Sequence, residues 1–466
     1  MEPTVAPGPA PPWWLEEAFA AEGGRVDAPV LDGDTQADVA IVGGGYTGLW
    51  TALGVLERTP SAHVVVLEAA FCGAGPSGRN GGFIEGYWPA FAELEALFGR
   101  ERAERLATAG EQIRPAVRGL GDDVWLREAG MMMVATTEAQ EHVVDRAVEA
   151  AARIGRPEQA IPLTAAEVAE RCRSPRFRRG VLFPDTGTVQ PARLVRALRR
   201  AALARGVVLH ENTRVTGVER GLVTAERGRV RAEQVVVATN AAMTDWRPVR
   251  GRLTVFGSYV VLTEPVPELL AGVGWTGGEA IVDARMFLHY FRTTDDGRVL
   301  MGSGSGPIGF RNRIDRRFTH DAATAGRAEL GLRRLLPGLA GAHVERAWGG
   351  PIDVSADHVP FVGTAAGGGV HFAAGYSGNG VGPSFLAGQA LASLATSRQD
   401  DWSTLPLVRG RGDRVPPEPI RYVGGAAIRR AILACEEADE AGSRAPVTAR
   451  AVAALPRLLG MRLGTR

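Results

Sequence analysis

The sequence contains no lysine, and all 53 of its basic residues are arginine. A complete Walker P-loop, a pyridoxal-phosphate Schiff base and a lysine nucleophile are therefore excluded, because each needs a lysine amine. Cysteine is scarce: Cys72, Cys172 and Cys435 lie far apart and form no CxxC pair. The histidines form no HExxH motif. We expect no metal site and no disulfide framework, and the few cysteines fit a reducing compartment.

The sequence also lacks an excess of charge and a long apolar run. Its net charge of +1 argues against nucleic acid as a partner. No stretch approaches the roughly 18 apolar residues of a membrane span, and the N-terminus has no basic start followed by an apolar run. We therefore expect no membrane span and no signal peptide, and we predict a cytoplasmic protein. A chain of 466 residues with 45% hydrophobic content favours two domains over one.

A dinucleotide-binding unit is present near the N-terminus, in "ADVAIVGGGYTGLW". The apolar residues 39–42 predict a buried strand, and Gly43, Gly45 and Gly48 then supply GxGxxG at the start of a helix. A second apolar strand, "HVVVLE", ends in Glu68. Since the glycines admit a pyrophosphate and the acid binds ribose hydroxyls, the unit predicts a dinucleotide without a 2′-phosphate.

A glycine-rich loop follows Glu68, with the sequence "AAFCGAGPSGRNGGF". Its backbone can approach a flat or charged ligand closely, and Ser77, Arg79 and Asn80 supply hydrogen-bond donors. Here the sequence resembles FAD-dependent amine and amino-acid oxidoreductases of the D-amino-acid oxidase and glycine oxidase type, closest to the γ-glutamylputrescine oxidase-like subgroup. That family carries "GASGRNGG" where this chain has "GAGPSGRNGG". Segments 186–215, 232–242 and 348–394 match the family in the same order.

The resemblance implies an α/β fold, with a Rossmann-like FAD domain of the glutathione-reductase-2 type and a substrate domain built on an antiparallel sheet. We expect the FAD domain to be discontinuous, over 36–119, 166–249 and 346–404. The substrate domain would take 120–165 and 250–345, and 405–466 would be a C-terminal helical extension. For this extension we expect packing on the flavin domain or at a subunit interface rather than on a membrane. Homo-oligomerisation is left open.

The cofactor implied by the resemblance is non-covalent FAD, because Gly350 stands where some relatives carry a linking cysteine and loop 74–82 has no histidine. The motif and the resemblance together predict the FAD contacts. These are Gly43, Gly45, Tyr46, Thr47, Gly48, Glu68, Ala74, Ser77, Gly78, Arg79, Asn80, Gly81, Gly82, Val215, Ala238, Thr239, Gly349, Gly375, Ser377, Gly378, Asn379, Gly380 and Val381.

The activity implied by the resemblance is oxidation of an amine C–N bond to an imine, by hydride transfer to flavin N5 and subsequent hydrolysis. Tyr259, Tyr290 and Asn379 are the candidate catalytic residues by family position, whereas His289 and Arg292 are predicted to be structural. A lysine thought to activate oxygen in monomeric sarcosine oxidase-type relatives has no counterpart here. The electron acceptor is therefore either oxygen, with the help of another charge, or a different acceptor.

The substrate class is predicted from two missing arginines. Glycine oxidase-like relatives hold the substrate carboxylate with the arginine of "WxGxRP", and here "WGGPID" has Ile352 at that position. A second arginine position is occupied by Gly378. We therefore expect an amine without an α-carboxylate anchored in that manner. The alternatives are an amino-acid oxidase anchored by Arg285 or Arg292, an oxidase of alcohols or hydroxy acids, and a flavin fold without redox activity.

Overall fold

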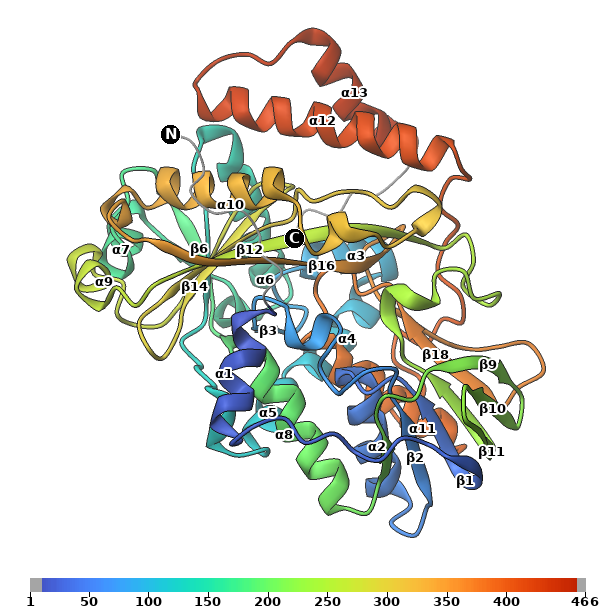
Figure 1. Cartoon of the computed structure of the whole chain (residues 1–466). Helices are drawn as coiled ribbons and strands as arrows, with labels where there is room; N and C mark the ends of the chain where they lie inside the picture. Colours follow the sequence, from blue (N-terminus) through green and yellow to red (C-terminus); the bar gives the residue numbers. More distant parts are fainter. Residues whose placement is uncertain (1–10, 459–466) are drawn as a thin grey trace.

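The computed structural model describes residues 11–458, and its first sheet is mainly parallel (Figure 1). The strand order is β17-β18-β11-β1-β2-β8, with a β9–β10 hairpin beside β11. Every pair from β18 to β8 is parallel, and β17 is antiparallel. The strands are β1 (Gly33–Val42), β2 (Val64–Leu67), β8 (Val208–His210), β9 (Val215–Glu219), β10 (Leu222–Ala225), β11 (Gly228–Val237), β17 (Phe361–Thr364) and β18 (Val370–Ala374).

Helices α2 (Tyr46–Arg58), α8 (Pro191–Ala204) and α11 (Pro383–Ala395) pack together in the same half of the molecule (Figure 1). Nearly every residue of α2 and α11 is buried, which explains why their sequences are apolar all round rather than on one stripe. The predicted strand, turn, helix and strand of the dinucleotide unit are β1, residues 43–45, α2 and β2. The predicted α/β fold is confirmed.

The second sheet has the strand order β16-β12-β15-β14-β13-β4-β6-β5, and among these pairs only β13 and β4 run parallel. The hairpin predicted around Asp295, Asp296 and Gly297 joins β14 to β15. Helix α10 (Ala322–Leu335) packs on β12 and β15. The strands are β4 (Met131–Val134), β5 (Ile161–Leu163), β6 (Gly180–Phe183), β12 (Leu253–Thr263), β13 (Ala280–Asp283), β14 (His289–Thr293), β15 (Val299–Ser303) and β16 (Val344–Ser355).

Two strands belong to this second sheet although the expected segments assign them to the flavin domain. Strand β6 pairs with β4, and β16 pairs along the whole of β12, from Leu253–Ser355 to Thr263–Val344. The segment "WGGPID" therefore lies on the edge of the second sheet, and the chain reaches the first sheet only afterwards, at β17. The sequence did not indicate the sheet to which these segments belong, because the pairing partners of a strand are distant in sequence.

The C-terminal extension forms α12 (Ile420–Glu440) and α13 (Val447–Leu458), drawn in red at the top of Figure 1. The expected packing on the flavin domain holds for residues 405–410, where the Val362 N–H donates to the carbonyl oxygen of Leu407 and the Gly410 N–H to that of Val362. Helix α12 instead contacts the second sheet and α10, through Arg285, Leu253, Ser305 and Arg334. Pro456 lies within α13 and does not end it. No helix in residues 11–458 has the length and apolarity that a membrane crossing requires.

Shorter elements connect these layers. A two-stranded ribbon, β3 (Phe83–Glu85) with β7 (Thr186–Thr188), lies apart from both sheets. The remaining α-helices of the described residues are α1 (Trp13–Ala21), α3 (Phe91–Phe98), α4 (Arg100–Gly110), α5 (Ile113–Arg118), α6 (Glu141–Arg153), α7 (Ala165–Arg171) and α9 (Pro267–Val273).

Candidate active site

Two cavities share part of their walls. The first, of about 690 Å³, is lined by Val42, Leu67 and Val237, the last residues of β1, β2 and β11. This is the carboxyl edge of a parallel sheet, where such folds bind ligands. The second, of about 580 Å³, is lined by residues of β12, β14, the 286–288 segment and the C-terminal helices. We call them the cofactor cavity and the substrate cavity. Residues that line both include Pro76, Asn80, Ile352, Gly378 and Val381.

The GxGxxG turn is packed so tightly that it requires glycine. A Cβ on Gly43 would lie 2.5 Å from the carbonyl oxygen of Ala238, and the φ angle of Gly43 is +113°. A Cβ on Gly48 would lie 1.9 Å from the carbonyl oxygen of Gly43. At the N-terminus of α2 the Tyr46 N–H donates to Ser77 Oγ at 3.0 Å. This helix terminus, with its positive dipole end, lines the cofactor cavity and fits a pyrophosphate.

Glu68 follows β2 and lines the cofactor cavity. Its carboxylate accepts hydrogen bonds from Gly44 N–H at 2.8 Å and Ala70 N–H at 3.0 Å. Burial raises the pKa of this carboxyl above its usual value, although the two N–H donors oppose the rise. The acid is therefore held in place before a ribose arrives, as a hydroxyl-binding residue should be.

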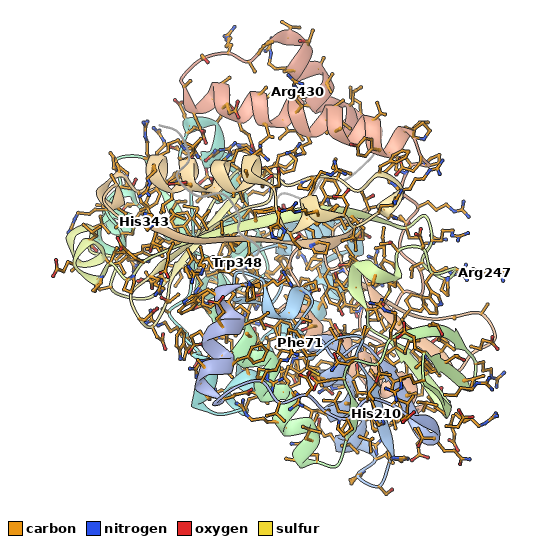
Figure 2. The ribbon with its side chains drawn as sticks, viewed as in Figure 1. Phe71, His210, Arg247, His343, Trp348 and Arg430 are labelled. Atoms are coloured by element: carbon orange, nitrogen blue, oxygen red, sulfur yellow. The ribbon has the colours of Figure 1, made fainter. Side chains whose placement is uncertain are left out.

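The glycine-rich loop is fastened by two tryptophans that reach its backbone from different elements. Trp14 of α1 donates to the carbonyl oxygen of Asn80 at 3.0 Å, and Trp348 of β16 donates to that of Arg79 at 2.8 Å. Trp348 is labelled near the middle of Figure 2. Arg79 in turn donates to the carbonyl oxygen of Ala74 at 2.9 Å. Trp14 is also buried in the core, and hydrogen bonds from two elements hold the loop where the two cavities meet.

Asp353 organises the C-terminal turn "GYSGNG", and sequence reasoning missed it. Its buried carboxylate accepts hydrogen bonds from Gly375 N–H at 2.5 Å, Tyr376 N–H at 3.2 Å and Asn240 Nδ2 at 2.7 Å. Burial raises its pKa to about 7. Tyr376 also meets Thr47 of α2, hydroxyl to hydroxyl, at 2.7 Å. An acid directly after the matched "WGGPI" was the available signal.

The predicted FAD contacts divide into three groups by location. Those lining the cofactor cavity are Gly43, Gly45, Tyr46, Thr47, Glu68, Ser77, Asn80, Val215, Ala238, Thr239, Gly378, Gly380 and Val381. Those lining only the substrate cavity are Arg79, Gly81, Gly82, Ser377 and Asn379. Lining neither are Gly48, Ala74, Gly78, Gly349 and Gly375. The glycines of the last group allow close packing instead; a Cβ on Gly78, for example, would lie 2.3 Å from the carbonyl oxygen of Gly73.

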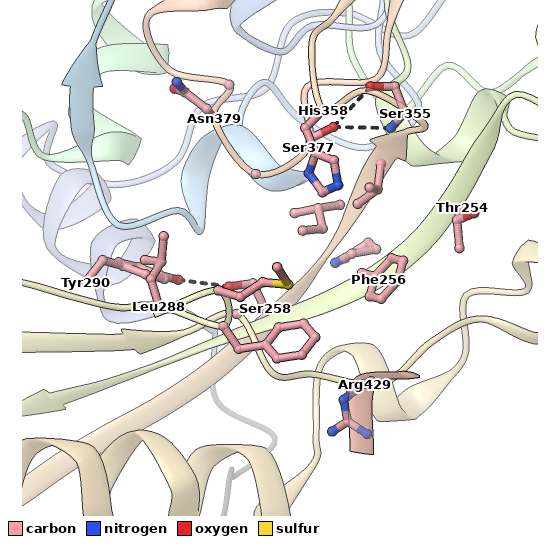
Figure 3. A pocket seen from close by; sticks show the side chains of 18 of the residues that line it. Thr254, Phe256, Ser258, Leu288, Tyr290, Ser355, His358, Ser377, Asn379 and Arg429 are labelled. Atoms are coloured by element: carbon pink, nitrogen blue, oxygen red, sulfur yellow. Dashed lines mark hydrogen bonds between the residues drawn. The ribbon is translucent and has the colours of Figure 1, made fainter. Parts of the chain in front are cut away.

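The substrate cavity has polar groups on the side of the C-terminal turn. Figure 3 shows Asn379, Ser377 and His358 on one side of it and Arg429 on the other. Ser377 and His358 have φ angles of +55° and +61°, a strained region for residues other than glycine. Among the described residues the Asn379 side chain has no hydrogen-bond partner. His358 was not predicted, and its strained backbone is invisible in the sequence.

The two candidate tyrosines have different surroundings. Tyr290 lines the substrate cavity, and its hydroxyl lies 2.9 Å from Ser258 Oγ. Tyr259 is 0% exposed in the core of the second sheet and donates to the carbonyl oxygen of Arg317 at 2.5 Å. The expectation that Tyr259 lines the pocket is wrong in this structure. Alternation along β12 puts Ser258, not Tyr259, on the cavity face.

The other charged residues considered in the second sheet, His289, Arg292 and Arg285, form hydrogen bonds or ion pairs within the protein. His289 Nδ1 lies 2.7 Å from Asp283 Oδ2, which confirms a structural role. Arg292 is 0% exposed, donates to backbone carbonyls and packs over Trp14. Arg285 pairs with Glu436 at 2.9 Å and with Glu440 of α12. Neither arginine lines the substrate cavity.

Other parts of the lining fall outside the predicted set. Met131, Met132 and Met133 are all buried in hydrophobic core clusters, and Met131 and Met133 also line the substrate cavity. Helices α12 and α13 contribute lining residues that no motif indicated. Within residues 11–458 no cluster of three His, Cys, Asp or Glu side chains could hold a metal ion.

Known proteins are similar to this chain over most of its length. It is 29% identical over 418 residues to a probable oxidoreductase OrdL of Rhizobium meliloti (strain 1021), covering 87% of this chain and 91% of the relative. It is 29% identical over 410 residues to the gamma-glutamylputrescine oxidoreductase of Escherichia coli (strain K12), covering 85% and 93%.

Solved structures share the fold. The glycine oxidase from Geobacillus kaustophilus superposes with a TM-score of 0.65 at 23% identity, covering 80% of this chain and 99% of the other. The L-proline dehydrogenase from P. horikoshii gives a TM-score of 0.66 at 20% identity, covering 81% and 96%. The family model described as FAD dependent oxidoreductase matches residues 38–394. The chain therefore belongs to the FAD dependent oxidoreductase family, and its cofactor is FAD.

Proposed function

We propose that this oxidoreductase converts the C–N bond of an amine to an imine, which water then hydrolyses. The observation that carries the proposal is the shared wall of the two cavities, where Asn80, Ile352 and Gly378 lie between the cofactor cavity and the substrate cavity. Bound FAD supplies the two-electron acceptor. The protein supplies the positions of the reactants, because amine oxidation of this kind needs orientation more than acid–base groups.

The residues of the cofactor cavity have distinct roles in the proposal. Glu68 binds the ribose hydroxyls, and the N-terminus of α2 faces the pyrophosphate. The loop around Asn80 and the turn at 375–380 hold the reactive end between the cavities. Within the described residues, no cysteine or histidine lines the cofactor cavity, so we propose non-covalent binding.

On the substrate side, Tyr290 with Ser258 forms one polar wall and Asn379 with His358 forms another. These groups orient the neutral amine, and the Asn379 amide is available as a donor or acceptor. The apolar Ile352 stands at the boundary where an anchoring arginine would face an α-carboxylate. We therefore propose amines that carry no carboxylate on the reacting carbon. The relative from Escherichia coli is a gamma-glutamylputrescine oxidoreductase, which supports an amine substrate.

The runner-up is an amino-acid oxidase or dehydrogenase with a relocated carboxylate anchor. Arg285 and Arg292 are engaged elsewhere, so the arginines that line the cavity, Arg79, Arg421 and Arg429, would have to serve. This candidate is retained because a glycine oxidase, which is named for an amino-acid substrate, has the same fold.

A substrate screen under nitrogen tests the proposal. The purified yellow protein is mixed with primary amines, N-methyl amines, amino acids and hydroxy acids, and bleaching of the visible flavin absorption is followed. We expect bleaching by amines first. Bleaching by hydroxy acids alone, or by no compound in a protein that retains FAD, would contradict the proposal. Stopped-flow reoxidation with air then identifies the acceptor, since rapid reoxidation supports an oxidase and slow reoxidation a dehydrogenase.

A further inference from the structure

The C-terminal extension lies beyond the part of the chain that the family model matches, which ends at residue 394. Similar solved structures cover about four-fifths of this chain while being covered almost whole, as with 80% and 99% for the glycine oxidase. Helices α12 and α13 nevertheless line the substrate cavity. Part of this cavity is therefore specific to chains that carry such an extension.

One face of α12 makes this wall. Arg421, Gly424, Ile428 and Ile432 line the cavity at helical spacing, together with the neighbouring Gly425 and Arg429 and the exposed Ile420 and Ala427 at its rim. Val423, next to Gly424, is 62% exposed and does not line the cavity, and Arg430 lies on the exposed side of α12 (Figure 2). The helix thus presents one face to the cavity and the other to solvent.

Buried ion pairs fasten this wall to the second sheet. Arg285 lies between Glu436 and Glu440 of α12, at 2.9 and 2.8 Å, and the Met286 N–H donates to Glu436 at 2.7 Å. At the other end of the face, Arg421 donates to the carbonyl oxygen of Leu253 at 3.2 Å, and Arg429 to that of Ser305 at 3.1 Å. The helix is anchored at both ends of its cavity face, so its position fixes the size of the cavity.

Two adjacent glycines interrupt this face inside a 21-residue helix, where each costs about 1 kcal/mol relative to alanine. Packing explains Gly425, because a Cβ there would lie 3.3 Å from Ile308 Cδ1. Packing does not explain Gly424, whose Cβ would meet no atom within 4 Å. The missing side chain at Gly424 leaves open space in the cavity wall.

We propose that the cavity face of α12, centred on Gly424, is the specificity wall of the substrate site and admits a bulky apolar substituent of the amine. The inference rests on the proposed function and extends it to a substrate class: primary or secondary amines with a long alkyl or aromatic group. Phe256, Met286, Phe287 and Leu288 supply the opposing apolar surface, with Ile428 and Ile432 on the helix. Both arginines of the face donate to backbone carbonyls.

The test introduces side chains that fill the open space at Gly424. Gly424→Leu and Gly424→Phe are compared with Val423→Phe, which adds a ring to the exposed side of the same helix. Anaerobic flavin reduction is measured with ethylamine and with hexylamine and phenethylamine. We expect both Gly424 variants to slow the larger amines by at least about tenfold and ethylamine by less than about twofold. Val423→Phe should reduce the flavin at the same rates as the parent. The unfolding temperature of the Gly424 variants should not fall, since replacing a helical glycine favours the helix. Equal effects on small and large amines, or none, would overturn the inference.

Binding of unreactive amines separates this inference from the proposed function. tert-Butylamine and tert-octylamine have no hydrogen on the carbon beside nitrogen, so they bind without being oxidised. Titration calorimetry on the FAD-loaded protein should show tert-octylamine binding weakened at least about tenfold by Gly424→Phe, with tert-butylamine unaffected. This result without any bleaching amine would refute the proposed function and leave the specificity wall standing. Unchanged or absent tert-octylamine binding would refute the wall.

Discussion

The two cavities are built by different means. The cofactor cavity depends on backbone features, which are glycines with no room for a Cβ, a helix N-terminus and strand ends; each feature lies in a short sequence motif, although the motifs are spread from Val42 to Ser384. The substrate cavity is formed by side chains from β12, β14, the 286–288 segment and α12, which are more than 160 residues apart at the extremes. A dinucleotide imposes the same backbone wherever it binds, whereas a substrate is matched by side chains that several elements contribute.

The largest effect is expected in the backbone of the cofactor cavity. Gly43→Ala puts a Cβ 2.5 Å from a carbonyl oxygen at a φ of +113°, and strain of about 1–3 kcal/mol together with that clash should weaken FAD binding by about 100-fold. The ratio of flavin to protein after purification and titration of apoprotein with FAD measure it. Gly272→Ala, at an exposed helical glycine with open space around it, is the matched control. Full FAD retention in Gly43→Ala would contradict the claim that the backbone of this turn determines FAD binding.

Glu68 tests the polar part of the same cavity. Glu68→Gln removes a charge-assisted contact to the ribose, worth about 1.5–3 kcal/mol, so FAD affinity should fall at least about tenfold. Because its NH2 group is only a donor, the glutamine side chain cannot accept from both the Gly44 and Ala70 N–H groups in the same way, so the apoprotein should also unfold at a lower temperature. Glu57→Gln, on the exposed side of α2, should leave the affinity unchanged. If Glu68→Gln binds FAD as tightly as the parent, Glu68 serves only the Gly44 and Ala70 N–H groups.

The local motifs explain why so much of the cofactor cavity was predictable. Residues 39–48 indicated a strand, a turn and the start of a helix from local sequence alone, and Glu68 indicated the ribose-binding acid. The structure brings Glu68, Val215 and Ala238 together in the wall of the cofactor cavity. Gly48 and Gly78 line neither cavity, and a Cβ on either would meet the backbone carbonyl oxygen of Gly43 or Gly73, so both positions require glycine for packing. Asp353 was missed because its importance lies in three hydrogen bonds to groups more than 20 residues away.

The substrate cavity was predicted poorly for the opposite reason. Tyr290 was identified by its family position, but choosing between Ser258 and Tyr259 on β12 required the register with β15 and β16. The contribution of α12 could not be predicted at all, since nothing local to residues 420–432 indicates which surface the helix covers. The ion pairs of Arg285 with Glu436 and Glu440 join segments about 150 residues apart.

The raised pKa of Asp353 should make the free energy of unfolding depend on pH near neutrality. Its pKa of about 7 in the folded protein lies above the unfolded value of 3.8, so the folded state binds more protons between these limits. The stabilisation from Asp353 is therefore full below about pH 4 and is lost as pH rises through 7. Asp353→Asn should remove this dependence, so the parent's advantage over the variant shrinks from pH 5 to pH 8. Unfolding of the apoprotein at each pH measures this difference, and an advantage that stays constant from pH 5 to pH 8 would show that Asp353 is ionised in both the folded and the unfolded state.

The smallest effects should distinguish the two tyrosines. Tyr290→Phe removes the hydroxyl next to Ser258 in the cavity, and we expect anaerobic flavin reduction to slow about five- to tenfold with unchanged unfolding temperature. Tyr259→Phe removes a buried hydrogen bond, which should cost about 1 kcal/mol of stability without changing the reduction rate. If Tyr259→Phe slows reduction more than Tyr290→Phe, the assignment of cavity faces on β12 is wrong.

The central claim, that the reacting carbon carries no anchored carboxylate, is tested most directly by substrates that differ in that group alone. Anaerobic stopped-flow reduction is measured with phenethylamine and with each enantiomer of phenylalanine, at matched concentrations of the neutral amine. The account predicts that phenethylamine reduces the flavin at least about 100-fold faster than either enantiomer, because Ile352 offers the carboxylate no partner. Faster reduction by one phenylalanine enantiomer, lost on changing Arg79 or Arg429 to glutamine, would contradict it.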